Sequence, residues 1–132
     1  TFVLPRDLVA RKVPAELVST LNQDPASPFF RLVKRASDRG TSEAVVTDTA
    51  LLSLIKSSLS NPLGALAPFK SVGREGGGDV AGMYRILTTY WSAVKAVFPD
   101  AWGKDPKQSR LMHSAGLMAM GLLMDAIYER LP

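Results

Sequence analysis

The chain has 132 residues, of which 46% are apolar, and its 16 Lys and Arg against 12 Asp and Glu give a net charge of +4. This composition is too apolar for a disordered chain, and the length suits one domain with one core. The absence of cysteine excludes a disulfide framework, a thiolate metal site and a thiol nucleophile, and it favours a reducing, cytoplasmic compartment.

The two ends of the chain suggest how it is placed in a larger protein. Residues 1–5 contain no initiator methionine and lack the basic start and apolar stretch of a secretory signal. We therefore expect residues 1–132 to form a single domain that is the C-terminal part of a longer protein. The longest uncharged run, residues 111–124, falls short of the roughly 20 residues that span a bilayer, so we expect a buried helix and no membrane contact.

The first predicted helix covers residues 14–22. Pro14 is placed at its first position, where a missing N–H costs no hydrogen bond, and Asn22 suits its end. Two prolines then predict a turn or an extended connection over residues 23–28. The apolar face of this helix would be Leu17, Val18 and Leu21.

Two patterns conflict between residues 29 and 47. Apolar side chains at positions 29, 32, 33 and 36 have helical spacing, whereas residues 43–47 have the β-branched composition of a short strand. A lone strand cannot satisfy its backbone hydrogen bonds, and residues 31–36 are the nearest possible partner across a turn at 38–40. We predict a small antiparallel β-hairpin here, closed by Asp48 as the cap of the next helix.

The helix after Asp48 is predicted to end at residues 60–62, because Pro62 cannot continue it. Residues 64–78 follow as a flexible loop, since glycine adds backbone freedom and few of these side chains can be buried. The glycines at 73 and 76–78 precede a helix, where a phosphate cradle is conceivable. The Walker spacing is missing and Asp79 opens the helix, so we favour a flexible connection.

Two long helices are predicted in the second half of the chain. Asp79 caps the first, which carries one apolar stripe and ends at Pro99. Pro106 starts the second, which runs to about residue 131 and is apolar almost all round. We expect these two helices to pack lengthwise against each other, and the small residues at 115, 116, 119 and 121 to let a neighbouring helix approach closely. The expected fold is mainly α, with about five helices around one core and at most one small hairpin.

Most candidate catalytic residues fit structural roles. His113 is the only histidine, which excludes a metal site or triad that needs two histidines. A Ser-His pair with Ser109 or Ser114 has no evident third member, so we expect His113 to be a packed, hydrogen-bonded structural residue. The carboxylates at 100, 105, 125 and 129 fit caps and solvated faces. The aromatic residues, which could stack on bases, fit core packing better: Tyr84, Tyr90, Trp91, Phe98 and Trp102. We expect no enzymatic activity, no cofactor and no metal.

The basic excess lies in the first half, where residues 1–74 hold ten Lys and Arg against six Asp and Glu. The candidate nucleic-acid-binding group is Arg31, Lys34, Arg35 and Arg39, opposed locally only by Asp38. Nothing here has the pattern of a recognition helix, so these side chains would contact phosphates rather than bases. A solvated surface with no ligand is the alternative.

The order of several short motifs resembles the C-terminal half of DGQHR-domain proteins. These are Asn22 with Ser27-Pro28-Phe29, the hairpin-like stretch and its following helix, Tyr90-Trp91 with Val97-Phe98-Pro99 and Trp102, and Ser109 to Gly116. That bacterial family includes the DndB-like proteins associated with DNA phosphorothioation and is distantly similar to ParB-like domains. The Asp-Gly-Gln-His-Arg motif itself is absent from this chain, so the resemblance implies that the motif lies in a part further upstream.

The resemblance implies a helical module of a protein for DNA modification, defence or its regulation. The basic group described above adds the expectation of weak, non-specific nucleic-acid binding. The alternative is a protein-interaction or scaffolding domain without nucleic-acid contact, which a large bare apolar patch would favour. The candidate partners are DNA, an upstream domain of the same protein and a second copy of the chain.

Overall fold

The structure is a computed structural model that describes residues 6–34, 44–70 and 79–131. It is mainly helical, as predicted, but the described residues form four α-helices where about five were expected. The α-helices are α1 (Arg6–Gln23), α2 (Asp48–Ser60), α3 (Val80–Val97) and α4 (Ser114–Arg130), joined by two short strands, β1 (Val33–Lys34) and β2 (Val46–Thr47), and by 3-10 turns η1 (Ala67–Phe69) and η3 (Arg110–Met112).

Helix α1 begins well before the position that proline indicated. Pro14 lies inside the helix and is buried, so the prediction of a helix start at residue 14 was wrong. Proline cannot donate to the carbonyl four residues earlier, but the helix continues because its next turns are anchored in the core. Leu17, Val18 and Leu21 are fully buried there, as their spacing predicted.

The predicted antiparallel hairpin is instead a short parallel pairing. Val33 lies opposite Val46, and Lys34 lies opposite Thr47. The carbonyl of Leu32 accepts hydrogen bonds from the N–H groups of both Val45 and Val46 at 2.9 Å. Strands that pair in parallel need a crossover rather than a tight turn, so the turn motif at 38–40 could not define this arrangement. Residues 35–43, which include that motif, lie outside the described residues.

Helix α2 ends where Pro62 predicted, and its cap is one residue earlier than expected. Thr47 is the N-cap, and its hydroxyl accepts a hydrogen bond from the N–H of Ala50 at 3.2 Å. Asp48 is the first helical residue, where a carboxylate suits the positive end of the helix dipole.

The segment after α2 is more closely packed than a flexible loop over residues 64–78 implies. Ala65 and Leu66 are buried, and η1 follows them directly. Gly64 allows this turn, because a Cβ built on it would lie 1.9 Å from the carbonyl oxygen of Ser58. Residues 71–78, including the glycine-rich stretch, lie outside the described residues.

Helix α3 has the cap and the end that the sequence predicted. The carboxylate of Asp79 accepts a hydrogen bond from the N–H of Gly82 at 2.9 Å, and the helix ends before Pro99. Trp91 is fully buried on the inner side of the helix, 5.4 Å from the ring of Phe29. The remaining fully or largely buried side chains of the stripe are Met83, Leu87, Tyr90 and Val94.

Helix α4 starts later than Pro106 indicated. The carboxylate of Asp105 accepts a hydrogen bond from the N–H of Lys107 at 2.9 Å and forms a turn, after which η3 leads into the helix at Ser114. Gly116 permits the close return of the chain, since an added Cβ would lie 1.9 Å from the carbonyl oxygen of Arg110.

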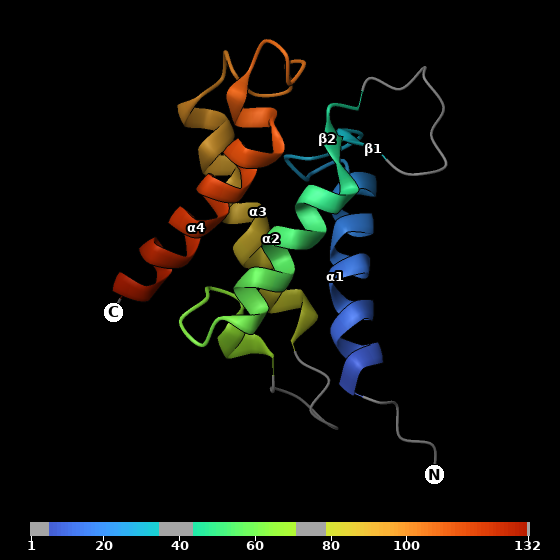
Figure 1. The fold of residues 1–132 in the computed structure, drawn as a ribbon, viewed down its shortest axis with the longest axis vertical. Coiled ribbons are helices and arrows are strands. Elements are labelled where there is room, and N and C mark those ends of the chain that lie inside the picture. Colours follow the sequence, from blue (N-terminus) through green and yellow to red (C-terminus); the bar gives the residue numbers. More distant parts are fainter. Residues whose placement is uncertain (1–5, 35–43, 71–78, 132) are drawn as a thin grey trace.

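The packing of α4 also differs from the prediction. It lies against α2 rather than lengthwise along α3, and α2 lies between α4 and α1, as Figure 1 shows. The hydroxyl of Tyr90 does donate to the carbonyl of Met120 at 2.7 Å, so α3 touches α4 locally. Gly121 supports the close approach of α2, because Leu54 lies 3.3 Å from where its Cβ would be. In the described part of the chain, none of the helices is long and apolar enough to cross a bilayer.

Candidate functional site

The structure describes half of the predicted basic group. Arg31 and Lys34 are both exposed, on the segment that leads from α1 into β1. Neither forms an ion pair with a carboxylate of the described residues, where the ion pair found is Lys12 with Glu16. Arg35 and Arg39 lie outside the described residues, so the four-residue group stays a prediction.

Arg31 has a backbone conformation that is costly for a side chain. Its φ of 60° lies in the left-handed region, which non-glycine residues seldom adopt. The conformation is fixed by Asn22, whose carbonyl accepts from the N–H of Arg31 at 3.0 Å and whose side-chain oxygen accepts from the N–H of Val33 at 3.2 Å. The guanidinium lies 5.0 Å from the ring centroid of Phe30, in cation–π range. The result is a cation that is held in place and still faces solvent.

His113 is not packed in a buried position, contrary to the prediction. It is exposed and forms the N-cap of α4, where its Nδ1 accepts a hydrogen bond from the N–H of Ala115 at 3.3 Å. The hydroxyl of Ser109 is directed elsewhere, to the carbonyl of Ala101 at 2.9 Å. Ser109 and His113 therefore do not form a nucleophile and base pair, and His113 acts as a cap.

One carboxylate lies inside the protein, contrary to the expectation of caps and solvated faces. Asp125, on the inner side of α4, accepts hydrogen bonds from the Ser58 hydroxyl at 2.7 Å and from the N–H of Ala65 at 2.9 Å. The Ser58 hydroxyl oxygen in turn accepts from the N–H of Leu66 at 3.2 Å. This network joins α4 to the end of α2 and to the turn before η1. Across the described ranges, no three side chains of the types His, Cys, Asp and Glu cluster as a metal site would require.

The aromatic residues are mainly core residues, as predicted. Trp91, Trp102 and Tyr90 are buried, and the indole N–H of Trp102 donates to the carbonyl of Pro28 at 3.1 Å. Burial raises the pKa of Tyr90, and the nearby carboxylate of Asp125 adds to this effect. Phe98 is the exception, since it is 45% exposed at the end of α3.

Tyr84 and Asp24 form a polar contact between α3 and the segment after α1. The Tyr84 hydroxyl donates to the carboxylate at 2.6 Å. Burial and this hydrogen bond raise the pKa of Tyr84 to about 12. The same bond, helped by a second from the N–H of Ala26, lowers the pKa of Asp24. With a neutral phenol and an ionised carboxylate at neutral pH, the pair stabilises the fold and offers neither an acid nor a base.

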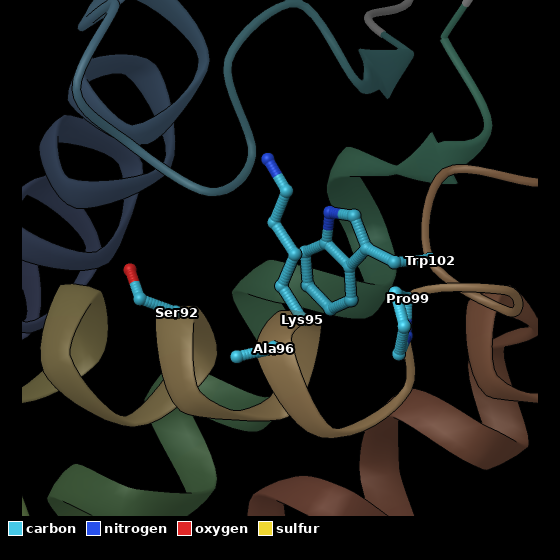
Figure 2. Close-up of a pocket in the computed structure, with 5 residues that line it drawn as sticks. All are labelled: Ser92, Lys95, Ala96, Pro99 and Trp102. Carbon is cyan, nitrogen blue, oxygen red and sulfur yellow. The ribbon is translucent and has the colours of Figure 1, made fainter.

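A shallow hollow of about 380 Å³ lies beside the last turns of α3. It is lined by Ser92, Lys95, Ala96, Pro99 and Trp102 (Figure 2). Figure 2 shows the side chains of Lys95 and Ser92 extending toward the same side as the indole of Trp102, which is itself largely buried. One ammonium group and one hydroxyl are the polar side-chain groups on its lining besides the indole, so the hollow provides no argument for a particular reaction.

The most distinctive surface of the described residues is on α4. Its inner side, with Leu117, Gly121 and Met124, is buried. We call the opposite side, formed by six exposed residues, the α4 outer face: Ala115, Ala119, Leu122, Leu123, Ala126 and Ile127. Leu122 is 58% exposed, and Figure 1 shows α4 at one edge of the molecule, with no described helix beyond it. An uncharged apolar face of this extent lies open to solvent.

Sequence reasoning missed the α4 outer face for an identifiable reason. The helix is apolar almost all round, and that pattern predicts complete burial. Large apolar residues lie on both sides, Leu117 and Met124 inward and Leu122 and Ile127 outward, so neither size nor polarity in the sequence distinguishes them.

Comparisons with protein-family models, with curated proteins and with solved structures each found no match for this chain. Its function is therefore inferred from its own residues.

Proposed function

We propose that this chain is a protein-interaction module that binds an apolar surface of a partner through the α4 outer face. The exposure of Leu122, Leu123 and Ile127 on one helix side carries this proposal. Single exposed leucines are common on soluble proteins, whereas a contiguous apolar helix face marks an interaction surface. Around this module we keep the context that the DGQHR resemblance implies, a bacterial protein of DNA modification or defence.

The energetics support a helical partner. Fully burying one Leu or Ile side chain contributes roughly 1.5–3 kcal/mol, and three such side chains on one face would offset much of the cost of association. The alanines on this face have small side chains, so the backbone of a docked helix can approach closely. The exposed charged residues near the two ends of α4 are Arg110, Glu129 and Arg130, and they would border such an interface.

The direct test is site-specific photo-cross-linking in the cells that make the protein. A benzophenone side chain replaces Leu122 in one variant and Thr89, an exposed residue of α3, in the matched control. We expect protein adducts from position 122, with the cross-linked peptide identified by mass spectrometry, and few from position 89. Equal adduct yields at the two positions, or none with protein at 122, would contradict the proposal.

A second candidate function is weak, sequence-tolerant binding of nucleic acid. Two observations favour it: Arg31 and Lys34 face solvent without a described acidic partner, and Arg31 is held in a strained conformation. Strained backbone persists only where surrounding contacts enforce it, and it is frequent at functional sites. The cations would contact phosphates, because the described residues offer no exposed helix with a base-reading pattern in this region.

A salt titration tests the nucleic-acid proposal. Duplex DNA is titrated into the wild type and into a variant with Arg31, Lys34, Arg35 and Arg39 all changed to Ala, at two salt concentrations. For every cation that binds a phosphate, its replacement by Ala should flatten the log–log salt slope by roughly 0.9. Equal affinity of the two proteins, or no binding at low salt, would leave the protein-interaction function alone.

A further inference from the structure

The backbone of residues 30–33 is fixed by hydrogen bonds from successive N–H groups. Those of residues 30 and 32 donate to the carbonyls three residues earlier, at 3.2 and 3.0 Å. Those of Arg31 and Val33 donate to one residue of α1, Asn22, through its carbonyl and its side-chain oxygen. All N–H groups of this segment are therefore occupied, and an anion that approaches it is left with side chains as donors.

Arg31 is the one non-glycine residue with a positive φ in the part of the chain that the structure describes. Its φ of 60° brings the Cβ close to the backbone, a crowding that glycine does not have. At this position glycine would therefore suit the fold better than arginine. Strain of this kind is frequent at binding sites, where a side chain is needed for a task other than folding.

The side chain of Arg31 is available to bind an anion. Its guanidinium lies over the ring of Phe30, 5.0 Å from the centroid, and forms no ion pair with a described carboxylate. A guanidinium has more N–H donors than this contact uses, so its edge can bind two oxygens of a phosphate at once. Lys34 follows on β1 next to the buried Val33, and its exposed side chain points to the opposite side, toward solvent.

We infer that Asn22 is a positioning residue for nucleic-acid binding: it keeps Arg31 in the strained conformation from which the guanidinium binds a backbone phosphate. This inference rests on the nucleic-acid function proposed above and names the residue that binds and the residue that positions it. A nucleic-acid strand suits this site better than a single anion, because its repeated phosphates can contact Lys34 as well as Arg31. The net charge of +4 on the chain attracts the same polyanion.

The first experiment compares Arg31→Gly with Arg31→Ala, which remove the same guanidinium and differ in backbone freedom. Both should bind short duplex DNA about tenfold more weakly than the wild type at low salt, because one charge-assisted contact is lost. Arg31→Gly should melt roughly 2–5 °C above Arg31→Ala, because glycine adopts a positive φ without strain. A glycine variant that melts at or below the alanine variant would show that position 31 is not strained, and would overturn the inference.

The second experiment tests whether Asn22 acts through Arg31. Asn22→Ala should weaken DNA binding about threefold or more in the wild type, and by less than about 1.5-fold when Arg31 is already alanine. Asn22→Gln, which moves the acceptor by one carbon, is a milder variant and should give the same pattern. Thr20→Ala is the matched control on α1, since its hydroxyl bonds within the helix to the carbonyl of Glu16, and it should change binding in neither background.

Circular dichroism spectra and melting curves accompany each variant, so that a loss of fold is separated from a loss of binding. Equal weakening by Asn22→Ala and by Asn22→Gln with and without Arg31 would show that Asn22 supports the fold in general, and would contradict its role as a positioning residue.

The third experiment identifies the ligand by competition. Polyglutamate presents carboxylates in place of phosphates and should displace duplex DNA from the wild type only weakly. Displacement as efficient as that by unlabelled DNA would assign the site to carboxylates and overturn the inference.

Failure of the inference differs from failure of the proposed function. DNA binding that Arg31→Ala leaves unchanged would keep the nucleic-acid function, assign it to other cations of the chain and overturn the role of Asn22. A wild type that binds no DNA at low salt would remove both.

Discussion

Helices α3 and α4 are both rich in apolar residues, but they use them differently. In α3 the apolar side chains form one stripe, and its central members, including Met83, Leu87 and Val94, are buried. In α4 the apolar residues surround the helix, so the contact with α2 covers one side and leaves Leu122 and Ile127 exposed. A helix with more apolar surface than its own domain can cover indicates a second surface for binding.

The largest expected effect is the contrast between one leucine on each helix. Leu87→Ala removes a fully buried side chain of α3 and should lower the free energy of unfolding by about 2–5 kcal/mol. Leu122→Ala removes an exposed side chain of α4 and should change it by no more than about 0.5 kcal/mol. Urea unfolding at a concentration where the protein is monomeric measures both. Similar destabilisation of the two variants would mean that Leu122 is covered in the monomer.

A second contrast compares two carboxylates of α4 that lie one turn apart, one buried and one exposed. Asp125→Ala leaves the Ser58 hydroxyl and the Ala65 N–H without their acceptor, which should cost about 1–3 kcal/mol of unfolding free energy. Glu129→Ala, one turn later and exposed, should change it by less than about 0.5 kcal/mol. The same urea experiment compares them. If Glu129→Ala were the more destabilising change, the hydrogen bonds of Asp125 would not be the contacts that hold α4 to the end of α2.

The smallest expected effect concerns the polar contact of α3. Tyr84→Phe removes the hydrogen bond to Asp24, and the stability difference from the wild type should depend on pH at both ends of the range. Because folding lowers the pKa of Asp24, its contribution is present above the ordinary value of 3.8 and is lost as the pH falls below it. Because folding raises the pKa of Tyr84, that contribution is complete below pH 10.0 and is lost toward about 12.

Thermal unfolding of the two proteins between pH 2 and 11 checks this prediction. The difference in melting temperature should be constant from about pH 5 to 9 and should shrink on either side. A difference that does not change with pH would show that the hydroxyl contributes only through packing.

The parts of the fold that the sequence predicted well are those with local signals. The cap at Asp79 and the stop at Pro99 defined α3, and Pro62 defined the end of α2. Local signals failed where tertiary contacts decided the outcome. Pro14 lies within α1 because the turns that follow it are buried in the core. Pro106 belongs to a turn that the carboxylate of Asp105 stabilises.

The candidate sites depended even more on long-range contacts. The network of Asp125 and Ser58 joins residues 67 positions apart, and no spacing rule connects them. The parallel pairing of β1 with β2 is likewise held by backbone hydrogen bonds to the carbonyl of Leu32 and not by a turn motif. Arg31 and Lys34 are exposed, as phosphate contact would require. Arg35 and Arg39 lie outside the described residues.

The central claim is that α4 has an outer face which its own domain leaves uncovered. Methyl NMR with a soluble paramagnetic agent tests this most directly. We expect strong broadening of the methyl signals of Leu122 and Ile127, which are exposed, and little broadening of those of Leu117 and Met124, which are buried. Equal protection of the two pairs would contradict the claim.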